Sequence, residues 1–260
     1  MAVITSSERH NSANWVWIHQ LKATKNRLIA ITLCAFLRCA GPTGLVAQQP
    51  DNSVVVRGID SSVKARIDNL AGYAVTEHYA VFRSHDETHP AAEMTVRTVY
   101  RKGYGKSYTV LSESGSSLLR SEVLGTLLDN EKRMSQPGNV ETALIDSANY
   151  EIKLTSNPQR QLDGRDCLVV SLTPRRVSPY LFKGTLWVDA KDYAIVQLDG
   201  TAAKSPFFLV SAAQVLRQYA NIEGFPMAIH ARAISKSSLI GQTVVKVDYT
   251  GYQIELHKGQ

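Results

Sequence analysis

The sequence has few cysteines, no apolar run long enough for a membrane span and only a small excess of charge. Its apolar run at residues 28–37 has ten residues, whereas a helix that crosses a bilayer needs about 20. The formal net charge is +6, but residues 1–47 carry five basic side chains and one acidic one. The remaining residues hold 24 basic and 22 acidic side chains, a net charge of +2, which gives no case for a nucleic-acid partner.

Residues 1–47 contain, in order, the features typical of an export signal. Basic side chains precede the apolar run 28–37, the helix breakers Pro42 and Gly44 follow it, and Ala47 offers a small residue for cleavage. The apolar region of a signal peptide needs only roughly 7–15 residues. We therefore expect a signal peptide that is cleaved near Ala47 and a periplasmic mature chain. A buried core helix is the alternative interpretation of the apolar run.

Removal of this leader would take two of the three cysteines with it. Cys34 and Cys39 lie within it, so Cys167 would be alone and the mature monomer could form no disulfide. Cys39 follows Arg38 rather than the small residue that lipid attachment requires, which argues against a lipoprotein. Cys167 lies in an apolar, alternating stretch, where a buried and unreactive thiol is expected.

Two stretches of the mature chain have helical periodicity. From Ser53 to about Leu70, apolar residues recur every three or four positions with charged residues between them. A second stretch runs from about Ser117 to Met134 and stops at a Gln-Pro-Gly sequence. Each is predicted to be an amphipathic helix that needs an apolar surface to cover.

The rest of the mature chain is rich in strand patterns. Strands are expected at 73–81, 95–101, 107–111, 149–156, 165–173, 183–190, 193–201, 208–220, 225–237 and 243–254. Asp163-Gly164 is typical of a tight hairpin turn, and residues 190–192 predict another. Short turns between strands predict an antiparallel meander, and two helices are too few for a βαβ fold. Residues 48–260 are thus expected to be a single, mainly β (α+β) domain: a large curved sheet with helices on one face.

Two histidines four residues apart raise the question of a metal site. A zinc protease needs His-Glu-x-x-His on a helix, but between His85 and His89 the glutamate, Glu87, stands at the third position of the segment. Pro90 follows at once, and the segment joins two strands. We expect a polar loop here, with metal ligation as the alternative.

Other short motifs give no catalytic constellation. Gly105-Lys106-Ser107 is similar to the end of a phosphate-binding loop, but Tyr100 stands where that motif needs its first glycine, so a hairpin turn is expected. The sequence has no Gly-x-Ser-x-Gly elbow, and no pair of acids stands out as a general acid and base. We expect no enzyme, no cofactor and no metal. Arg175-Arg176 is interpreted as a solvated turn rather than an anion site.

Aromatic side chains are the candidates for a binding site. Side chains of a strand alternate between its two faces, so adjacent phenylalanines cannot both face the core of a regular strand. Simple core packing is one interpretation of these aromatics, and the wall of an apolar pocket is the other. The candidate ligand-binding residues of an apolar cavity are Tyr100, Tyr108, Tyr180, Phe182, Trp187, Phe207 and Phe208.

A series of short motifs in the C-terminal half resembles a known family. They are Leu-Asp-Gly-Arg-Asp-Cys at 162–167, Leu-Thr-Pro-Arg-Arg at 172–176, Gly-Thr-Leu-Trp-Val-Asp at 184–189, Tyr-Ala-Ile-Val at 193–196 and Gly-Phe-Pro at 224–226. Together they resemble bacterial outer-membrane lipoprotein-sorting proteins of the LolA/LolB-like group, which are related to the N-terminal domain of RseB/MucB proteins. The similarity extends over residues 62–256. It implies an open, strongly curved antiparallel half-barrel, with helices on the concave face and an apolar cavity for acyl chains.

The residues and the resemblance together predict a soluble periplasmic carrier or sensor. Its partner would be a lipid or an acylated lipoprotein, together with an inner- or outer-membrane protein, in outer-membrane biogenesis. Each methylene buried in such a cavity contributes about 0.8 kcal/mol, so an acyl chain alone could drive affinity. One alternative is an RseB-like interaction module that regulates an envelope stress response. A metal-dependent hydrolase that uses His85 and His89 is another.

Overall fold

The computed structural model describes residues 50–83, 86–204, 213–237 and 241–257, all within the unit Ala47–Gln260. The expected signal peptide lies outside the described residues. No helix in these four ranges is long and apolar enough to cross a membrane.

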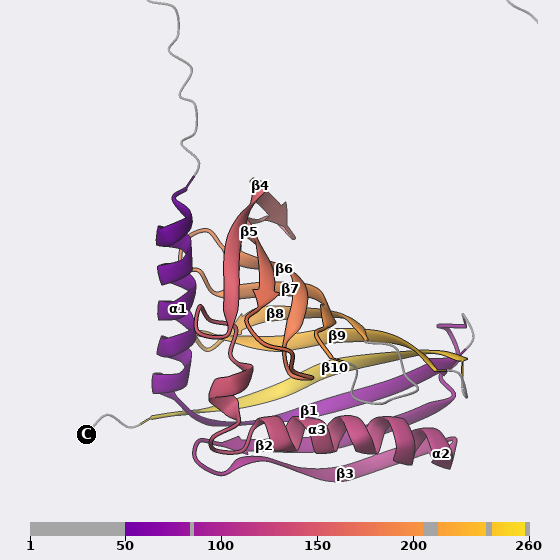
Figure 1. Ribbon diagram of the computed structural model, residues 1–260. Coiled ribbons are helices and arrows are strands. Elements are labelled where there is room, and N and C mark those ends of the chain that lie inside the picture. Colours follow the sequence, from indigo (N-terminus) through magenta and orange to yellow (C-terminus); the bar gives the residue numbers. More distant parts are fainter. Residues whose placement is uncertain (1–49, 84–85, 205–212, 238–240, 258–260) are drawn as a thin grey trace, which may run out of the picture. The chain divides into compact units, whose positions relative to one another are not determined.

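One ten-stranded antiparallel sheet makes up most of this unit (Figure 1). Its strands are β1 (Leu70–Arg83), β2 (Ala92–Arg101), β3 (Gly105–Gly115), β4 (Tyr150–Leu162), β5 (Arg165–Pro174), β6 (Phe182–Asp189), β7 (Ile195–Ala202), β8 (Gln214–Ile222), β9 (Phe225–Ser237) and β10 (Gly241–Leu256). Where the structure describes them, the strand positions expected from the sequence are confirmed within a few residues. Of the strand expected at 208–220, residues 208–212 lie outside the described part of the chain, and β8 begins at Gln214.

The strand order is β3-β2-β1-β10-β9-β8-β7-β6-β5-β4, so the first and last strands of the chain pair inside the sheet. The two edges are β3 and β4, and the sheet does not close between them. The mainly β, open and curved half-barrel expected from the sequence is thus confirmed. The helical segment that joins β3 to β4 has to pass from one edge of the sheet to the other.

Turn chemistry agrees with the sequence. Asp163 and Gly164 have φ values of 51° and 76°, because a tight two-residue hairpin needs positive φ at both central positions. At the β6–β7 pairing, Gly184 stands opposite Gly200. A Cβ on Gly184 would lie 2.1 Å from the backbone oxygen of Asp199, so glycine is what permits this close approach.

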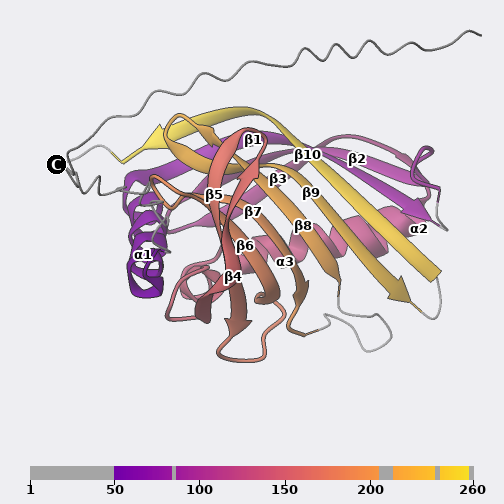
Figure 2. The same cartoon turned by 90° about the horizontal axis from the view of Figure 1, so that it is seen from above.

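The helices are α1 (Asn52–Asn69), α2 (Ser117–Leu119), η1 (Arg120–Gly125), α3 (Thr126–Met134) and η2 (Val140–Ala143). Asp51 caps the N-terminus of α1, and its carboxylate accepts a hydrogen bond from the backbone N–H of Ser53 at 2.7 Å. The helix expected at 117–134 is one continuous helical stretch whose middle part, η1, is a π-helix. Figure 2 shows the strands arching over α3, with α1 at one end of the sheet.

Apolar side chains under the helices form two separate cores. In the first core, Leu119, Leu124 and Leu128 of the 117–134 stretch pack on side chains of β1, β2 and β10. In the second core, Val55 and Ile59 of α1 pack on side chains of β4, β5 and β6. Each helix is therefore held by its own patch of the sheet.

Candidate functional site

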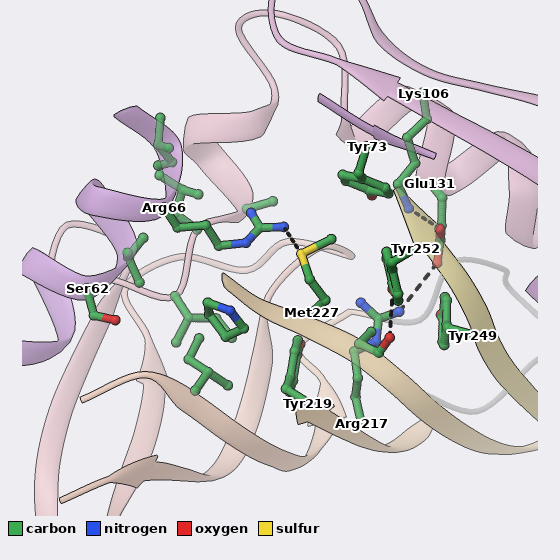
Figure 3. Close-up of a pocket in the computed structure, with 18 of the residues that line it drawn as sticks. Ser62, Arg66, Tyr73, Lys106, Glu131, Arg217, Tyr219, Met227, Tyr249 and Tyr252 are labelled. Atoms are coloured by element: carbon green, nitrogen blue, oxygen red, sulfur yellow. Dashed lines mark hydrogen bonds and ion pairs between the residues drawn. The ribbon is translucent and has the colours of Figure 1, made fainter. Parts of the chain in front are cut away.

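A cavity of about 230 Å³ lies where the two cores meet (Figure 3). Its walls come from α1, α3, the segment after η2, and strands β1, β3, β7, β8, β9 and β10. Elements from both halves of the chain thus contribute to one site, and its two ends differ in chemistry.

The end beside α1 is mostly apolar. The apolar stripe of α1 continues from Val55 and Ile59 to Val63 and Ile67, but only the first two are fully buried in the second core. Val63 and Ile67 are half-buried and line the cavity. The facing apolar side chains are Leu144, Ile145, Ile195, Pro226, Met227 and Ala228.

The end beside α3 carries an ion-pair cluster of Lys106, Glu131 and Arg217. Glu131 Oε2 lies 2.5 Å from Lys106 Nζ, and Glu131 Oε1 lies 3.4 Å from Arg217 Nη2. The side chains of Lys106, Glu131 and Arg217 are 20%, 10% and 32% exposed. The three residues come from β3, α3 and β8, so this cluster also ties α3 to two distant strands.

A second carboxylate, Glu77 of β1, lines the same end and is fully buried. Its Oε2 accepts a hydrogen bond from the Tyr79 hydroxyl, whereas its Oε1 has no hydrogen-bond partner among the described residues. The neighbours of Glu77 on its strand face, Val75 and Tyr79, belong to the first core. An acid at this position is costly unless it is neutral or finds a partner.

Burial and neighbouring charges push the pKa values of the two acids in opposite directions. Burial raises the pKa of Glu77 and outweighs the attraction of Lys106, and the charge of Glu131 raises it further. Burial opposes the charged form of Glu131 as well, but Lys106 and Arg217 together hold its pKa below the ordinary value. The cavity therefore favours one ionised and one protonated carboxyl group.

Two guanidinium groups face the cavity with donors that lack an anionic or oxygen acceptor. Arg66 of α1 reaches Met227 Sδ with its Nη2 at 3.8 Å, and it makes no ion pair with any acid of the described residues (Figure 3). The Nε of Arg217 is buried without a hydrogen-bond partner in the same part of the chain. A thioether is a weak acceptor, so Arg66 keeps most of its donor capacity.

Tyrosines form much of the remaining wall. Tyr73 stacks on Tyr100 with ring centroids 5.3 Å apart and lies 6.0 Å from the ring of Tyr252. The hydroxyl of Tyr252 donates a hydrogen bond to the backbone oxygen of Ala228 at 2.6 Å. Burial raises the pKa values of Tyr249 and Tyr252, so both stay neutral hydrogen-bonding groups at physiological pH.

The aromatic residues proposed from the sequence lie around the sheet rather than together. Tyr100 lies behind Tyr73, and Tyr108 lines a separate open groove beside the 117–134 helical stretch. Phe182 packs against the second core, and Tyr180 is half-buried in the loop before β6. Phe207 and Phe208 lie outside the described residues. None of the five described candidates is among the residues that line the cavity.

Trp187 shows why aromatic character alone does not locate the site. Leu186 and Val188, its neighbours on β6, point into the second core. Because side chains alternate along a strand, Trp187 lies on the opposite face, where it pairs in register with Val169. It therefore faces away from the helices.

The other motifs take the following positions. His89 is exposed and its Nδ1 lies 3.2 Å from Asp86 Oδ2, while His85 lies outside the described residues. No group of three or more metal-ligating side chains is found in the described ranges. Arg175 Nε and Arg176 Nη2 donate to the backbone oxygens of Ser147 and Thr142 at 2.9 and 2.5 Å, and both arginines are exposed. Cys167 is buried and free.

The sequence contained one signal for the site that the search for motifs missed. Val75, Glu77, Tyr79 and Val81 share one face of β1, so an acid interrupts an otherwise apolar row. Lys106, which the sequence associated only with a hairpin turn, forms the ion pair described above. Its contact with Glu131 joins residues 25 positions apart, and the contact of Glu131 with Arg217 spans 86 positions, so local patterns could not reveal the cluster.

No protein-family model matches the chain, and no curated protein is significantly similar to it. Solved structures of similar fold include the following three. A LolA superfamily protein from Nitrosomonas europaea has 13% identity and a TM-score of 0.43 and covers 80% of this chain and 94% of its own. A DUF1329 family protein from Desulfovibrio piger has 13% identity and a TM-score of 0.39, with 77% and 93% covered.

The third is a domain from Vibrio parahaemolyticus that is provisionally named an outer membrane lipoprotein-sorting protein. It has 12% identity and a TM-score of 0.45 and covers 78% of this chain and 94% of its own. The likeness concerns the fold, and the function has to be argued from the residues of this chain.

Proposed function

We propose that this chain is a periplasmic carrier or sensor that binds the acyl chain of a lipid or lipoprotein in the cavity between the two cores. The observation that carries the proposal is the stripe of α1. Its first half is sealed in the second core, whereas Val63, at the margin of that core, and Ile67 line the cavity together with Ile145 and Ile195. Apolar side chains that line a space rather than fill a core are a place where methylene groups gain free energy by burial.

The size of the cavity sets a condition on this binding. Its volume of about 230 Å³ is below the roughly 300–1,000 Å³ of pockets that enclose a drug-sized ligand. A long acyl chain therefore has to extend out of the cavity or widen it. The wall at 143–145 is the part that we expect to move, because it is the end of η2 and the start of the following loop rather than packed sheet.

The first half of α1 is, by contrast, firmly attached. Asn52 Oδ1 accepts a hydrogen bond from the backbone N–H of Leu154 at 2.7 Å, and the Asp60 carboxylate accepts two from Ser147, at 2.8 and 2.6 Å. We therefore expect binding to displace the second half of α1 or the loop it faces, and to leave the contacts of Asn52 in place.

The test varies the chain length of the ligand and keeps its head group constant. Native mass spectrometry of the exported protein should show bound acyl species that delipidation removes. Titration of the delipidated protein with myristate and with the shorter decanoate should then give an affinity for myristate that is about tenfold higher or more. Equal affinities for the two would contradict acyl-chain binding.

Matched variants on one helix locate the binding. Val63→Trp fills the apolar end of the cavity and should abolish myristate binding. Val54→Trp makes the same change at a position on α1 that is 43% exposed and does not line the cavity, so it should bind normally. A loss of binding that is equal in both variants would place the chain elsewhere.

A further inference from the structure

We infer that the ligand carries a negatively charged oxyacid head group, a carboxylate or a phosphate, which binds between Arg66 and Arg217 while its chain lies along the second half of α1. This inference rests on the proposed function, since it specifies the head group of the same acyl ligand. It is carried by the unused donors of the two arginines and by the opposite chemistry of the two ends of the cavity.

Arg66 provides the first argument. It lies on α1 between Val63 and Ile67, the two apolar residues that border the cavity, and its guanidinium group is directed into the cavity (Figure 3). Its hydrogen-bond acceptor there is the sulfur of Met227, at 3.8 Å. A guanidinium group is built to hold two oxygens of a carboxylate or phosphate, so a thioether leaves this capacity unused.

Arg217 provides the second argument. Its Nη2 pairs with Glu131, but that carboxylate is shared with Lys106, which lies closer. Its Nε is buried and has no partner among the described residues, and Arg217 lines the same cavity as Arg66. A buried donor without an acceptor is costly, and an anionic oxygen of a ligand would satisfy it.

The charges that line the cavity are also unbalanced. Three cations, Arg66, Lys106 and Arg217, face two acids, Glu77 and Glu131. Since burial raises the pKa of Glu77, the effective surplus of positive charge is larger than this count indicates. An anion would find compensation here, whereas a cationic head group would be repelled.

The two ends of the cavity fix the orientation of such a ligand. The charged end beside α3 adjoins the buried side chains of the first core. The apolar end lies beside Val63, Ile67 and the 143–145 loop, the region that can widen. The head group therefore enters first and the chain follows along α1.

The experiment keeps the chain constant and varies the head group. Delipidated exported protein is titrated with myristate, tetradecyl phosphate, monomyristoylglycerol and tetradecyltrimethylammonium. Both anionic ligands should bind about tenfold or more tightly than the neutral ester, and the cationic ligand should bind most weakly. Preference between myristate and tetradecyl phosphate identifies the oxyacid, and acetate and inorganic phosphate show whether the head group binds without a chain.

Variants of α1 with the same change in net charge provide the control. Arg66→Gln should weaken binding of the preferred anionic ligand about tenfold or more and change binding of monomyristoylglycerol little. Lys64→Gln removes an exposed positive charge that pairs with Asp68 on the same helix, and it should leave both affinities unchanged. Arg217→Lys retains the positive charge but loses the Nε donor. Like Arg66→Gln, it should weaken binding of the anionic ligand.

The outcomes separate the two proposals. Binding can depend on chain length and still show no preference for an anionic head group, or Arg66→Gln and Lys64→Gln can have equal effects. Either result overturns the head-group inference and leaves acyl binding in place. Absence of binding by every tetradecyl ligand overturns both. Since Arg66 has no structural ion pair in the described residues, its variant is expected to fold even if Arg217→Lys does not.

Discussion

At the scale of single residues, the site depends on ionisable side chains placed where burial and charge compete. Glu131 is stabilised as an anion by Lys106 and Arg217, whereas burial disfavours the charged form of Glu77, which accepts a hydrogen bond from Tyr79. These two acids must therefore make opposite contributions to the pH dependence of folding.

The free energy of unfolding should show both contributions. Glu77 has a raised pKa in the folded protein, so its contribution is fully present below its ordinary value of 4.5 and is lost as the pH rises through the raised value. Glu131 has a lowered pKa, so its contribution is present above the ordinary value and is lost as the pH falls through the folded one. We predict that Glu77→Gln, which mimics the protonated acid, removes the first dependence and keeps the second.

Urea unfolding of the wild type and Glu77→Gln from about pH 4 to about pH 8 measures this difference. The stability of the variant relative to the wild type should rise with pH over this range. A difference that stays constant would mean that Glu77 titrates as an ordinary exposed carboxyl group, and the description of the buried acid would be wrong.

At the scale of elements, α1 both packs on the second core and lines the cavity. Gly58 lies in its middle and contacts the ring of Tyr193, a residue of the β6–β7 turn with φ of 59°. A Cβ on Gly58 would lie 2.4 to 2.7 Å from three atoms of that ring. Glycine at this position sets how closely α1 approaches the second core.

We predict that Gly58→Ala destabilises the protein by about 1–3 kcal/mol. In an exposed helix the same change stabilises by about 0.5–1 kcal/mol, so the sign of the effect is diagnostic of the contact. Urea unfolding measures it. Tyr193→Ala in the Gly58→Ala background should recover part of the loss, because it removes the clashing ring.

Gly125 offers the matched control for this change. It is also helical, and beyond its chain neighbours and nearby helix backbone, the contact of an added Cβ with the described residues would be the Arg120 backbone oxygen, at 3.5 Å. Gly125→Ala should therefore be neutral or slightly stabilising. Equal destabilisation by the two alanine variants would show that the loss at Gly58 does not come from the Tyr193 ring.

At the scale of the whole molecule, the order of the strands explains why a cavity forms. The edge strands β3 and β4 follow each other in the sequence but lie at opposite edges of the sheet. The chain between them therefore runs across the open side. That connection carries α3 and the loop at 143–145, and both line the cavity with α1. Two helices on two separate cores leave space where the cores meet.

The whole-chain prediction concerns export. We predict that residues 1–47 are removed and that the mature chain begins at residue 48, because the order of basic residues, apolar run, helix breakers and Ala47 is that of a signal peptide. Intact-mass measurement of periplasmic protein checks the cleavage site. Recovery of the full chain in the cytoplasm would contradict both export and the proposed periplasmic role.

The sequence by itself determined the elements of this protein. Alternation with a period of two located the strands, the stripe of apolar residues located α1, and Asp163-Gly164 located a hairpin, because each signal depends on residues close together in the chain. The motifs of the C-terminal half indicated the half-barrel. The sequence also shows that Glu77 interrupts the apolar row of β1. The neighbouring residues in the sequence, however, do not identify which side chains surround Glu77.

Only the tertiary structure decided the site. Lys106, Glu131 and Arg217 come from β3, α3 and β8, and Arg66 comes from α1, so their meeting depends on how the helical connection crosses the sheet. The small net charge of residues 48–260 hid a local surplus of cations in one cavity. The physical reason is that periodicity reports which face a residue takes, whereas a site requires faces from distant segments to meet.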